Sequence, residues 1–144
     1  MARWIVACLG IALTAAAPPP AITPAERALL GTWEIVEAIE DGQPHEGFLK
    51  SRICFRWRGE FFWNEGDITS PKGEKGRAVW GLMPEVGKDA IGFGFAMLIR
   101  PGIYKLEGDN LTMCFAGRGE QKPPKKFTGS KESGNTLWRL KRVK

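Results

Sequence analysis

The chain has 144 residues, of which 21 are basic and 16 acidic, so its net charge is +5. This length suits one domain with its own hydrophobic core, and we find neither an internal repeat nor a second domain. The only histidine, His45, lies beside Pro44 in a predicted turn. A Ser-His-Asp catalytic triad needs a buried histidine that a carboxylate orients, and a histidine in a turn does not meet this requirement. Together with two separated cysteines it cannot complete a tetrahedral zinc site without several carboxylates. We therefore expect no catalytic residues, no metal and no cofactor, and we do not expect an enzyme.

Residues 1–17 have the pattern of a secretory signal peptide. Arg3 is followed by an apolar run from Trp4 to Ala16 and by alanines at the predicted cleavage site. Three prolines end this run well short of the roughly 20 apolar residues that a membrane-spanning helix needs. We predict a secreted or periplasmic protein without a transmembrane segment after cleavage, with a proline-rich linker over residues 18–23 and one domain over residues 24–144.

The domain begins with a predicted short helix. Thr23, Pro24 and Glu26 form a capping box, in which threonine caps the helix, proline takes its first position and glutamate reaches back. Gly31 ends the helix, because glycine adopts a left-handed backbone easily.

Apolar residues then alternate with polar ones, which is typical of half-buried strands. Trp33, Ile35 and Ile39 mark the first strand, which ends at the turn Asp41-Gly42. The next strand has one face made of Ile53, Phe55 and Trp57 and another made of Arg52, Cys54, Arg56 and Arg58. After Phe61-Phe62-Trp63, we interpret residues 64–67 as a turn.

The second half of the chain continues this pattern. Predicted strands cover residues 77–83, 90–99, 102–106, 111–115 and 136–143, and residues 117–134 form a long loop. Eight or nine short strands with frequent turn signals favour an antiparallel sandwich or barrel.

A short motif opens the first strand. Gly31-Thr32-Trp33 follows a short helix and resembles the lipocalin G-x-W signature. In lipocalins this tryptophan plugs one end of the barrel, and an arginine from near the last strand packs across it. The resemblance implies such structural roles for Gly31 and Trp33, with Arg139 or Arg142 as the arginine.

A longer series of matches follows one order along the chain. It comprises Leu30 to Glu34, the Asp41-Gly42 turn, residues 102–111, Cys114-Phe115, the segment around Phe127, Ser130 and Gly134, and Leu140 to Arg142. Together these residues resemble an uncharacterised lipocalin-like bacterial domain family, best known from planctomycetes. The resemblance implies an all-β fold, a small antiparallel lipocalin-like β-barrel of about eight strands with one short N-terminal helix. It implies no activity.

Two cysteines, Cys54 and Cys114, remain after the predicted cleavage. An exported protein permits a disulfide between them. Both residues alternate with apolar neighbours that we place inside, so we expect both thiols on the outer surface. Several strands separate them in the chain, and we therefore predict two free thiols.

Aromatic residues are the strongest functional signal. Inside a small barrel they either fill the core or line a ligand cavity. The candidates for a binding site in the barrel interior are Trp57, Trp63, Trp80, Phe93, Phe95 and Tyr104. We predict an exported binding protein whose partner is a small apolar molecule, a component of the cell envelope or another protein.

An alternative function is binding of an anionic polymer or nucleic acid. Residues 110–144 carry nine basic residues against two acidic ones, and residues 91–95 resemble the G-F-G-F segment of cold-shock RNA-binding domains. The second aromatic motif of those domains is missing, and export removes their usual ligand, so we do not expect nucleic acid as the partner. No pattern in the sequence indicates an oligomeric state.

Overall fold

The computed structural model describes residues 21–57, 64–95 and 98–144. The predicted signal peptide, Phe61, Phe62 and Trp63 lie outside these residues. The described elements are α1 (Pro24–Leu29), β1 (Gly31–Glu40), β2 (Gln43–Pro44), the 3-10 turn η1 (Glu46–Phe48), β3 (Arg52–Phe55), β4 (Asn64–Thr69), β5 (Lys75–Leu82), β6 (Ala90–Phe95), β7 (Leu98–Glu107), β8 (Asn110–Phe115) and β9 (Thr136–Arg142).

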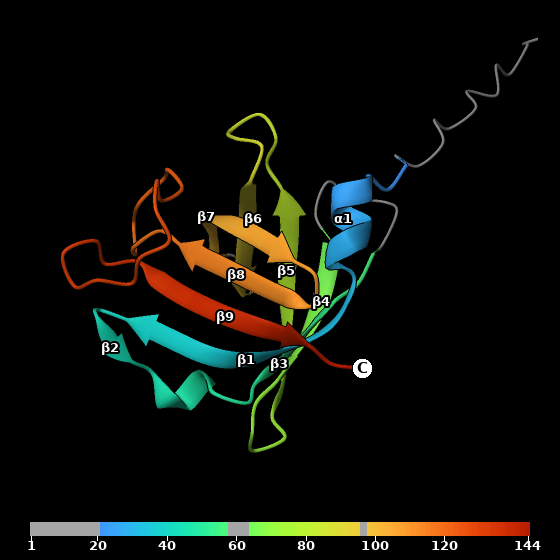
Figure 1. Ribbon diagram of the computed structural model, residues 1–144, viewed down its shortest axis with the longest axis horizontal. Coiled ribbons are helices and arrows are strands. Elements are labelled where there is room, and N and C mark those ends of the chain that lie inside the picture. The colour runs from blue at the N-terminus through green and yellow to red at the C-terminus, as the bar shows by residue number, and fades with distance from the viewer. Residues whose placement is uncertain (1–20, 58–63, 96–97) are drawn as a thin grey trace, which may run out of the picture.

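The strands form a closed antiparallel barrel (Figure 1). In the described part of the chain, β1 and β3 to β9 pair in sequence order, and β9 pairs back with β1, so eight strands close the barrel and β2 is an extra edge strand. The all-β barrel of about eight strands that the sequence predicts is therefore confirmed. Closure leaves the two-residue strand β2 as the edge, in place of the long exposed edges of an open sheet.

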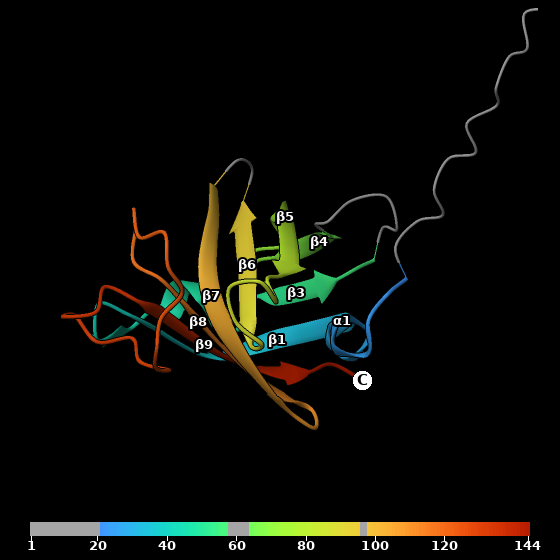
Figure 2. The same ribbon diagram turned by 90° about the horizontal axis from the view of Figure 1, so that it is seen from above.

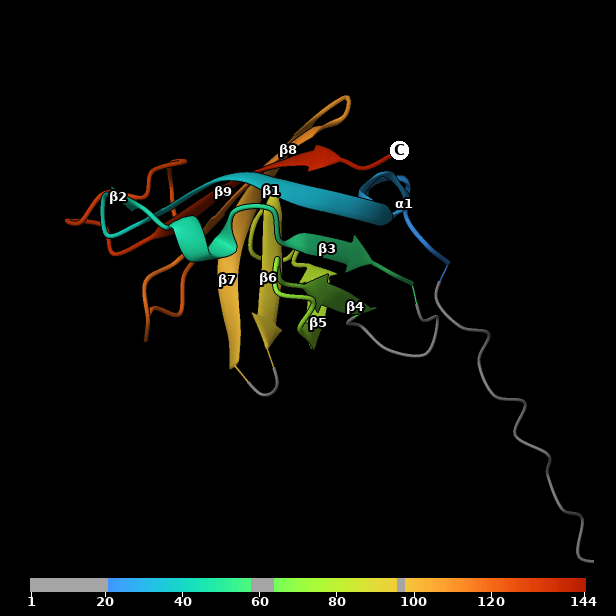
Figure 3. The same cartoon turned by 90° about the horizontal axis from the view of Figure 1, so that it is seen from below.

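Helix α1 is the expected short helix. The Thr23 hydroxyl accepts a hydrogen bond from the Glu26 backbone N–H at 3.2 Å, and the Glu26 carboxylate accepts one from the Thr23 backbone N–H at 2.8 Å. This capping box satisfies backbone donors that the first turn would leave free. Figure 3 shows α1 and the C-terminus at one end of the barrel, with β2 at the opposite end.

The core is one cluster of buried side chains inside the barrel, which extends from Leu29 of α1 to Phe93, Phe115 and Trp138. Phe55 and Trp80 meet edge to face with ring centroids 5.0 Å apart, and both side chains are buried. The indole N–H of Trp80 donates to the Arg56 carbonyl at 3.2 Å, so its polar atom is satisfied. The other buried members of this cluster include Leu29, Trp33, Ile35, Ile53, Ile91, Leu111, Met113 and Leu140.

Strand β1 departs from strict alternation. A β-bulge between Ile35 and Glu37 shifts its register against β9, so Ala38 rather than Ile39 pairs with Trp138 and enters the core. The alternation in the sequence predicts Ile39 on the same face as Trp33, and this is wrong, because the extra residue of a bulge reverses the faces that follow. Ile39 instead lies against Gly129 of the long loop.

Residues 64–67 form the start of β4 and not the predicted turn. Asn64 is fully buried, and Gly66 pairs with Phe55 of β3 and with Ala78 of β5. A Cβ atom at Gly66 would lie 2.5 Å from the carbonyl oxygen of Cys54. This glycine therefore permits the close approach of two strands and does not mark a reversal of the chain.

The predicted strand over residues 90–99 is also wrong, since these residues belong to two strands. Phe95 pairs with Leu98 and Ala90 with Ile103, so β6 and β7 form a hairpin. Figure 2 shows this hairpin extending beyond the strands beside it. Its two strands place Phe93 directly opposite Arg100, on the same face of the sheet.

Both cysteines are free, as predicted. Cys114 faces outward from the barrel wall, as predicted, but it is not exposed, because its side chain is fully buried. The long loop covers this part of the outer face, and the thiol donates a hydrogen bond to the Thr128 carbonyl at 3.4 Å. Burial raises the pKa of the Cys114 thiol.

Candidate ligand-binding site

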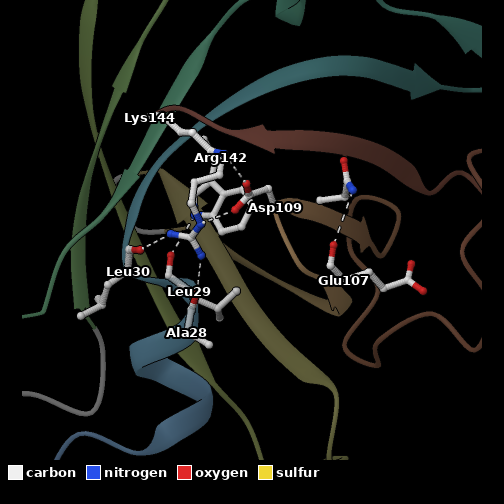
Figure 4. A network of polar contacts seen from close by, with 9 residues as sticks. Ala28, Leu29, Leu30, Glu107, Asp109, Arg142 and Lys144 are labelled. Atoms are coloured by element: carbon white, nitrogen blue, oxygen red, sulfur yellow. Dashed lines mark hydrogen bonds and ion pairs between the residues drawn. The ribbon is translucent and has the colours of Figure 1, made fainter.

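The barrel end next to α1 is closed. Trp33 is fully buried there, and its indole N–H donates to the Leu29 carbonyl at 2.8 Å. The guanidinium of Arg142 lies over the Trp33 ring, 4.1 Å from its centroid, and donates to the carbonyls of Ala28 and Leu30 at 2.7 and 2.8 Å. These groups join the end of the last strand to the end of the helix (Figure 4).

The two arginines considered from the lipocalin resemblance have different positions. Arg142 packs on Trp33 and also faces Asp109 at 3.6 Å. Arg139 lies away from Trp33, on the exposed outer face, where it pairs with Glu37 at 2.7 Å. Gly31 has a φ of 117°, and a Cβ atom there would meet the Arg142 guanidinium at 3.0 Å, so both its backbone and its lack of a side chain suit this junction.

The opposite end of the barrel holds a pocket of about 650 Å³. The end of β1, the β6–β7 hairpin, residues 117–121 and the start of β9 surround it. This volume is within the usual range for small-molecule sites. The pocket is lined by Glu40, His45, Phe48, Phe93, Gly94, Phe95, Leu98, Ile99, Arg100, Phe115, Gly117, Arg118, Gly119, Glu120, Gln121, Thr136 and Trp138.

Four aromatic rings form the apolar wall of the pocket. Trp138 contacts Phe48, Phe93 and Phe115, with ring centroids 5.3, 5.7 and 5.3 Å away. Phe93 also meets Phe55 at 6.3 Å, which links this wall to the packed core. Rings held by such mutual contacts form a rigid surface suited to an apolar ligand.

Polar groups lie beside this aromatic wall. Thr136 pairs with Glu40 of β1 and with Phe115 of β8, so these side chains share the inner face of the barrel. Arg100 is half-buried and reaches across β8 to donate from Nε to the Ala116 carbonyl at 2.9 Å and from Nη2 to the Thr136 hydroxyl at 3.2 Å. His45 Nε2 lies 3.7 Å from the Glu40 carboxylate.

Two buried polar atoms in pocket-lining residues have no hydrogen-bond partner in the described structure. They are the indole nitrogen of Trp138 and Nδ1 of His45. A buried donor without a partner is unfavourable by about 1–3 kcal/mol, and such atoms are rare in folded proteins.

The rim of the pocket is apolar on the hairpin side. Phe95, Leu98 and Ile99 are exposed by 44%, 79% and 42%. Leu98 pairs with Phe95, so these two side chains continue the inner face of the barrel beyond Phe93 and Arg100. The rim therefore presents an apolar entrance to the aromatic wall.

The structure brings two of the six predicted interior residues to this pocket, Phe93 and Phe95. Trp80 is fully buried in the core and lines no described pocket. Tyr104 lies toward the other end, in a shallow depression with Ala25 and Ala28 of α1, where burial raises its pKa. Trp57 is half-buried beyond the end of β3, and Trp63 lies outside the described residues.

The pocket includes residues that the sequence does not single out as a site: Phe48, Arg100, Phe115, Thr136 and Trp138. Trp138 and Phe115 are detectable from the sequence as inward positions of alternating strands. Arg100 was not detectable, because its position follows from the hairpin register that pairs it with Phe93.

No family model, curated protein or solved structure matches this chain. The resemblance to lipocalins and to the lipocalin-like bacterial family therefore stays a sequence-based prediction. Among residues 21–57, 64–95 and 98–144, no cluster of three or more histidine, cysteine or acidic side chains could hold a metal ion. No helix within these ranges is long and apolar enough to cross a membrane.

Proposed function

We propose that this protein is exported and binds a small, largely apolar molecule in the pocket at the open end of the barrel. The observation that carries the proposal is the contrast between the two barrel ends. One end is closed by Trp33 and Arg142, whereas the other has a pocket of about 650 Å³ with an aromatic wall. A barrel closed at one end and open at the other is suited to holding a ligand.

The alternative, binding of an anionic polymer, has less support. It needs aromatic side chains exposed on the strands for stacking. Phe93 and Trp80 are buried, and the exposed Phe95 belongs to the rim of the pocket. The same side chains therefore favour binding in the interior over binding on the outer face.

A neutral fluorescent dye, N-phenyl-1-naphthylamine, tests the proposal. Its emission rises when it leaves water, and we expect saturable binding of one dye per chain with a Kd of roughly 1–100 µM for a ligand of this size. Leu98→Ser removes part of the apolar entrance and should weaken binding by about three- to tenfold.

The matched control is Val86→Ser. Val86 is an exposed apolar residue that lines no described pocket, so this change should leave dye binding unaltered. Absence of saturable binding to the unmodified protein, or an equal loss in both variants, would contradict the proposal.

A further inference from the structure

Arg100 is a half-buried cation that makes no ion pair within the described residues. Its hydrogen-bond partners are neutral: the Ala116 carbonyl, which accepts from Nε and from Nη2, and the Thr136 hydroxyl. The remaining nitrogen, Nη1, has no described partner. Moving a charge partly out of water is unfavourable, and hydrogen bonds to neutral groups leave the charge of Arg100 without a counter-ion.

The surrounding charges do not neutralise Arg100 by contact. Burial lowers the pKa of Arg100, and Arg118 lowers it further, while Glu40 acts in the opposite direction from a distance. The Glu40 carboxylate is instead beside His45. Arg118 and Glu120 also line the pocket, but both are exposed at its rim, where water screens their charges.

Arg100 also lies in the wall of the pocket, where a bound ligand would contact it. It lies directly opposite Phe93 on the inner face, and the hydrogen bonds to Ala116 and Thr136 hold its guanidinium beside the aromatic wall. A held guanidinium recognises an oxyanion better than a mobile one, since less side-chain freedom is lost on binding. Apolar and cationic surfaces thus adjoin in one pocket.

We infer that the ligand of this pocket is an amphipathic anion. Its acidic group pairs with Arg100, and its apolar body lies on Phe93, Phe115 and Trp138. This inference rests on the proposed function, since it names the chemical class of the molecule bound at the same site.

Two dyes with nearly the same body separate the charge from the apolar contact. 1-Anilinonaphthalene-8-sulfonate carries a sulfonate, whereas N-phenyl-1-naphthylamine is neutral. We expect the purified protein to bind the sulfonate dye about tenfold or more tightly than the neutral one, because a charge-assisted hydrogen bond is added. Titration of both dyes, with the stoichiometry measured, gives this ratio directly.

Arg100→Gln should lower the affinity for the sulfonate dye by about tenfold and change that for the neutral dye by less than about twofold. Glutamine keeps a donor for the Ala116 carbonyl, and binding of the neutral dye reports that the barrel is intact. Arg77→Gln is the control, because Arg77 is an exposed arginine of β5 that lines no described pocket, and it should leave the ratio of the two affinities within about threefold of that of the unmodified protein.

The outcomes separate the two claims. If the unmodified protein binds neither dye, the proposed function fails. If it binds both equally, the pocket binds apolar molecules and the anionic preference is refuted. If Arg100→Gln leaves a preference for the sulfonate dye unchanged, the pairing of the acidic group with Arg100 is refuted. A ratio near one for the unmodified protein overturns the inference without any variant, so the inference stays testable even if Arg100→Gln does not fold.

Discussion

The guanidinium of Arg142, near the end of the last strand, lies 4.1 Å from the centre of the Trp33 ring at the start of the first. The same guanidinium donates to backbone carbonyls of Ala28 and Leu30 at the end of α1. Arg142 therefore connects the start and the end of the folded part of the chain, and it covers the end of the barrel next to α1.

Arg142→Met should destabilise the protein by about 2–4 kcal/mol. The change removes two charge-assisted hydrogen bonds and the contact with the Trp33 face, although methionine preserves some packing. Arg139→Met, on the same strand, removes only an exposed pair with Glu37 and should change stability by less than about 1 kcal/mol. Urea denaturation of both variants measures their free energies of unfolding. Equal losses would show that the contacts of Arg142 at the closed end add no more stability than an exposed ion pair.

Gly66→Ala should destabilise the barrel by about 1–3 kcal/mol, because its new methyl group would lie 2.5 Å from the Cys54 carbonyl oxygen. The matched control is Gly76→Ala on the neighbouring strand β5, where no atom lies within 4 Å of the added carbon. We expect the free energy of unfolding of the control to stay within about 0.5 kcal/mol of that of the original protein. A neutral effect of Gly66→Ala in thermal melts would mean that β3 and β4 do not approach this closely.

The two thiols should differ in reactivity. At pH 8, a thiol reagent should modify half-buried Cys54 in the folded protein and reach Cys114 only on unfolding, because Cys114 is buried and its pKa is raised. The raised pKa also means that stability is lost as pH rises through the alkaline range, since the unfolded thiol releases its proton first. Modification of both cysteines at one rate in the folded protein would contradict the burial of Cys114.

The N-terminal segment should be absent from the protein recovered from the envelope or medium of its native host. This expectation follows from Arg3, the apolar run after it and the alanines at residues 15–17. Intact-mass measurement gives the first residue of the processed chain. A full-length chain found in the soluble cytoplasmic fraction would refute export.

Much of the fold was predictable from local patterns. The capping box at Thr23 and the alternation of β8 and β9 depend on residues close in sequence, and they predict the helix and these strands correctly. Tertiary effects account for the errors. The bulge after Ile35 and the buried position of Asn64 depend on pairing with distant strands, which local propensity does not report.

The candidate site was less predictable than the fold. A count of aromatic residues does not distinguish Trp80, which lines no described pocket, from Trp138, which belongs to the same buried cluster and also lines the pocket. That distinction depends on how far each residue lies along the barrel axis, which follows from the register of all the strands. Arg100 was missed for the same reason, since residues 90–99 were interpreted as one strand.

The central claim is that the open end of the barrel, and not its core or its closed end, binds the ligand. Proton–nitrogen correlation spectra show each tryptophan indole N–H as a separate signal, and Trp138→Phe assigns the signal of Trp138. On addition of N-phenyl-1-naphthylamine, we predict a saturable shift of the Trp138 signal, while those of Trp33 and Trp80 stay in place, because only Trp138 of these three lines the pocket. An unchanged Trp138 signal under conditions in which the dye binds, or shifts confined to Trp33 and Trp80, would contradict the account.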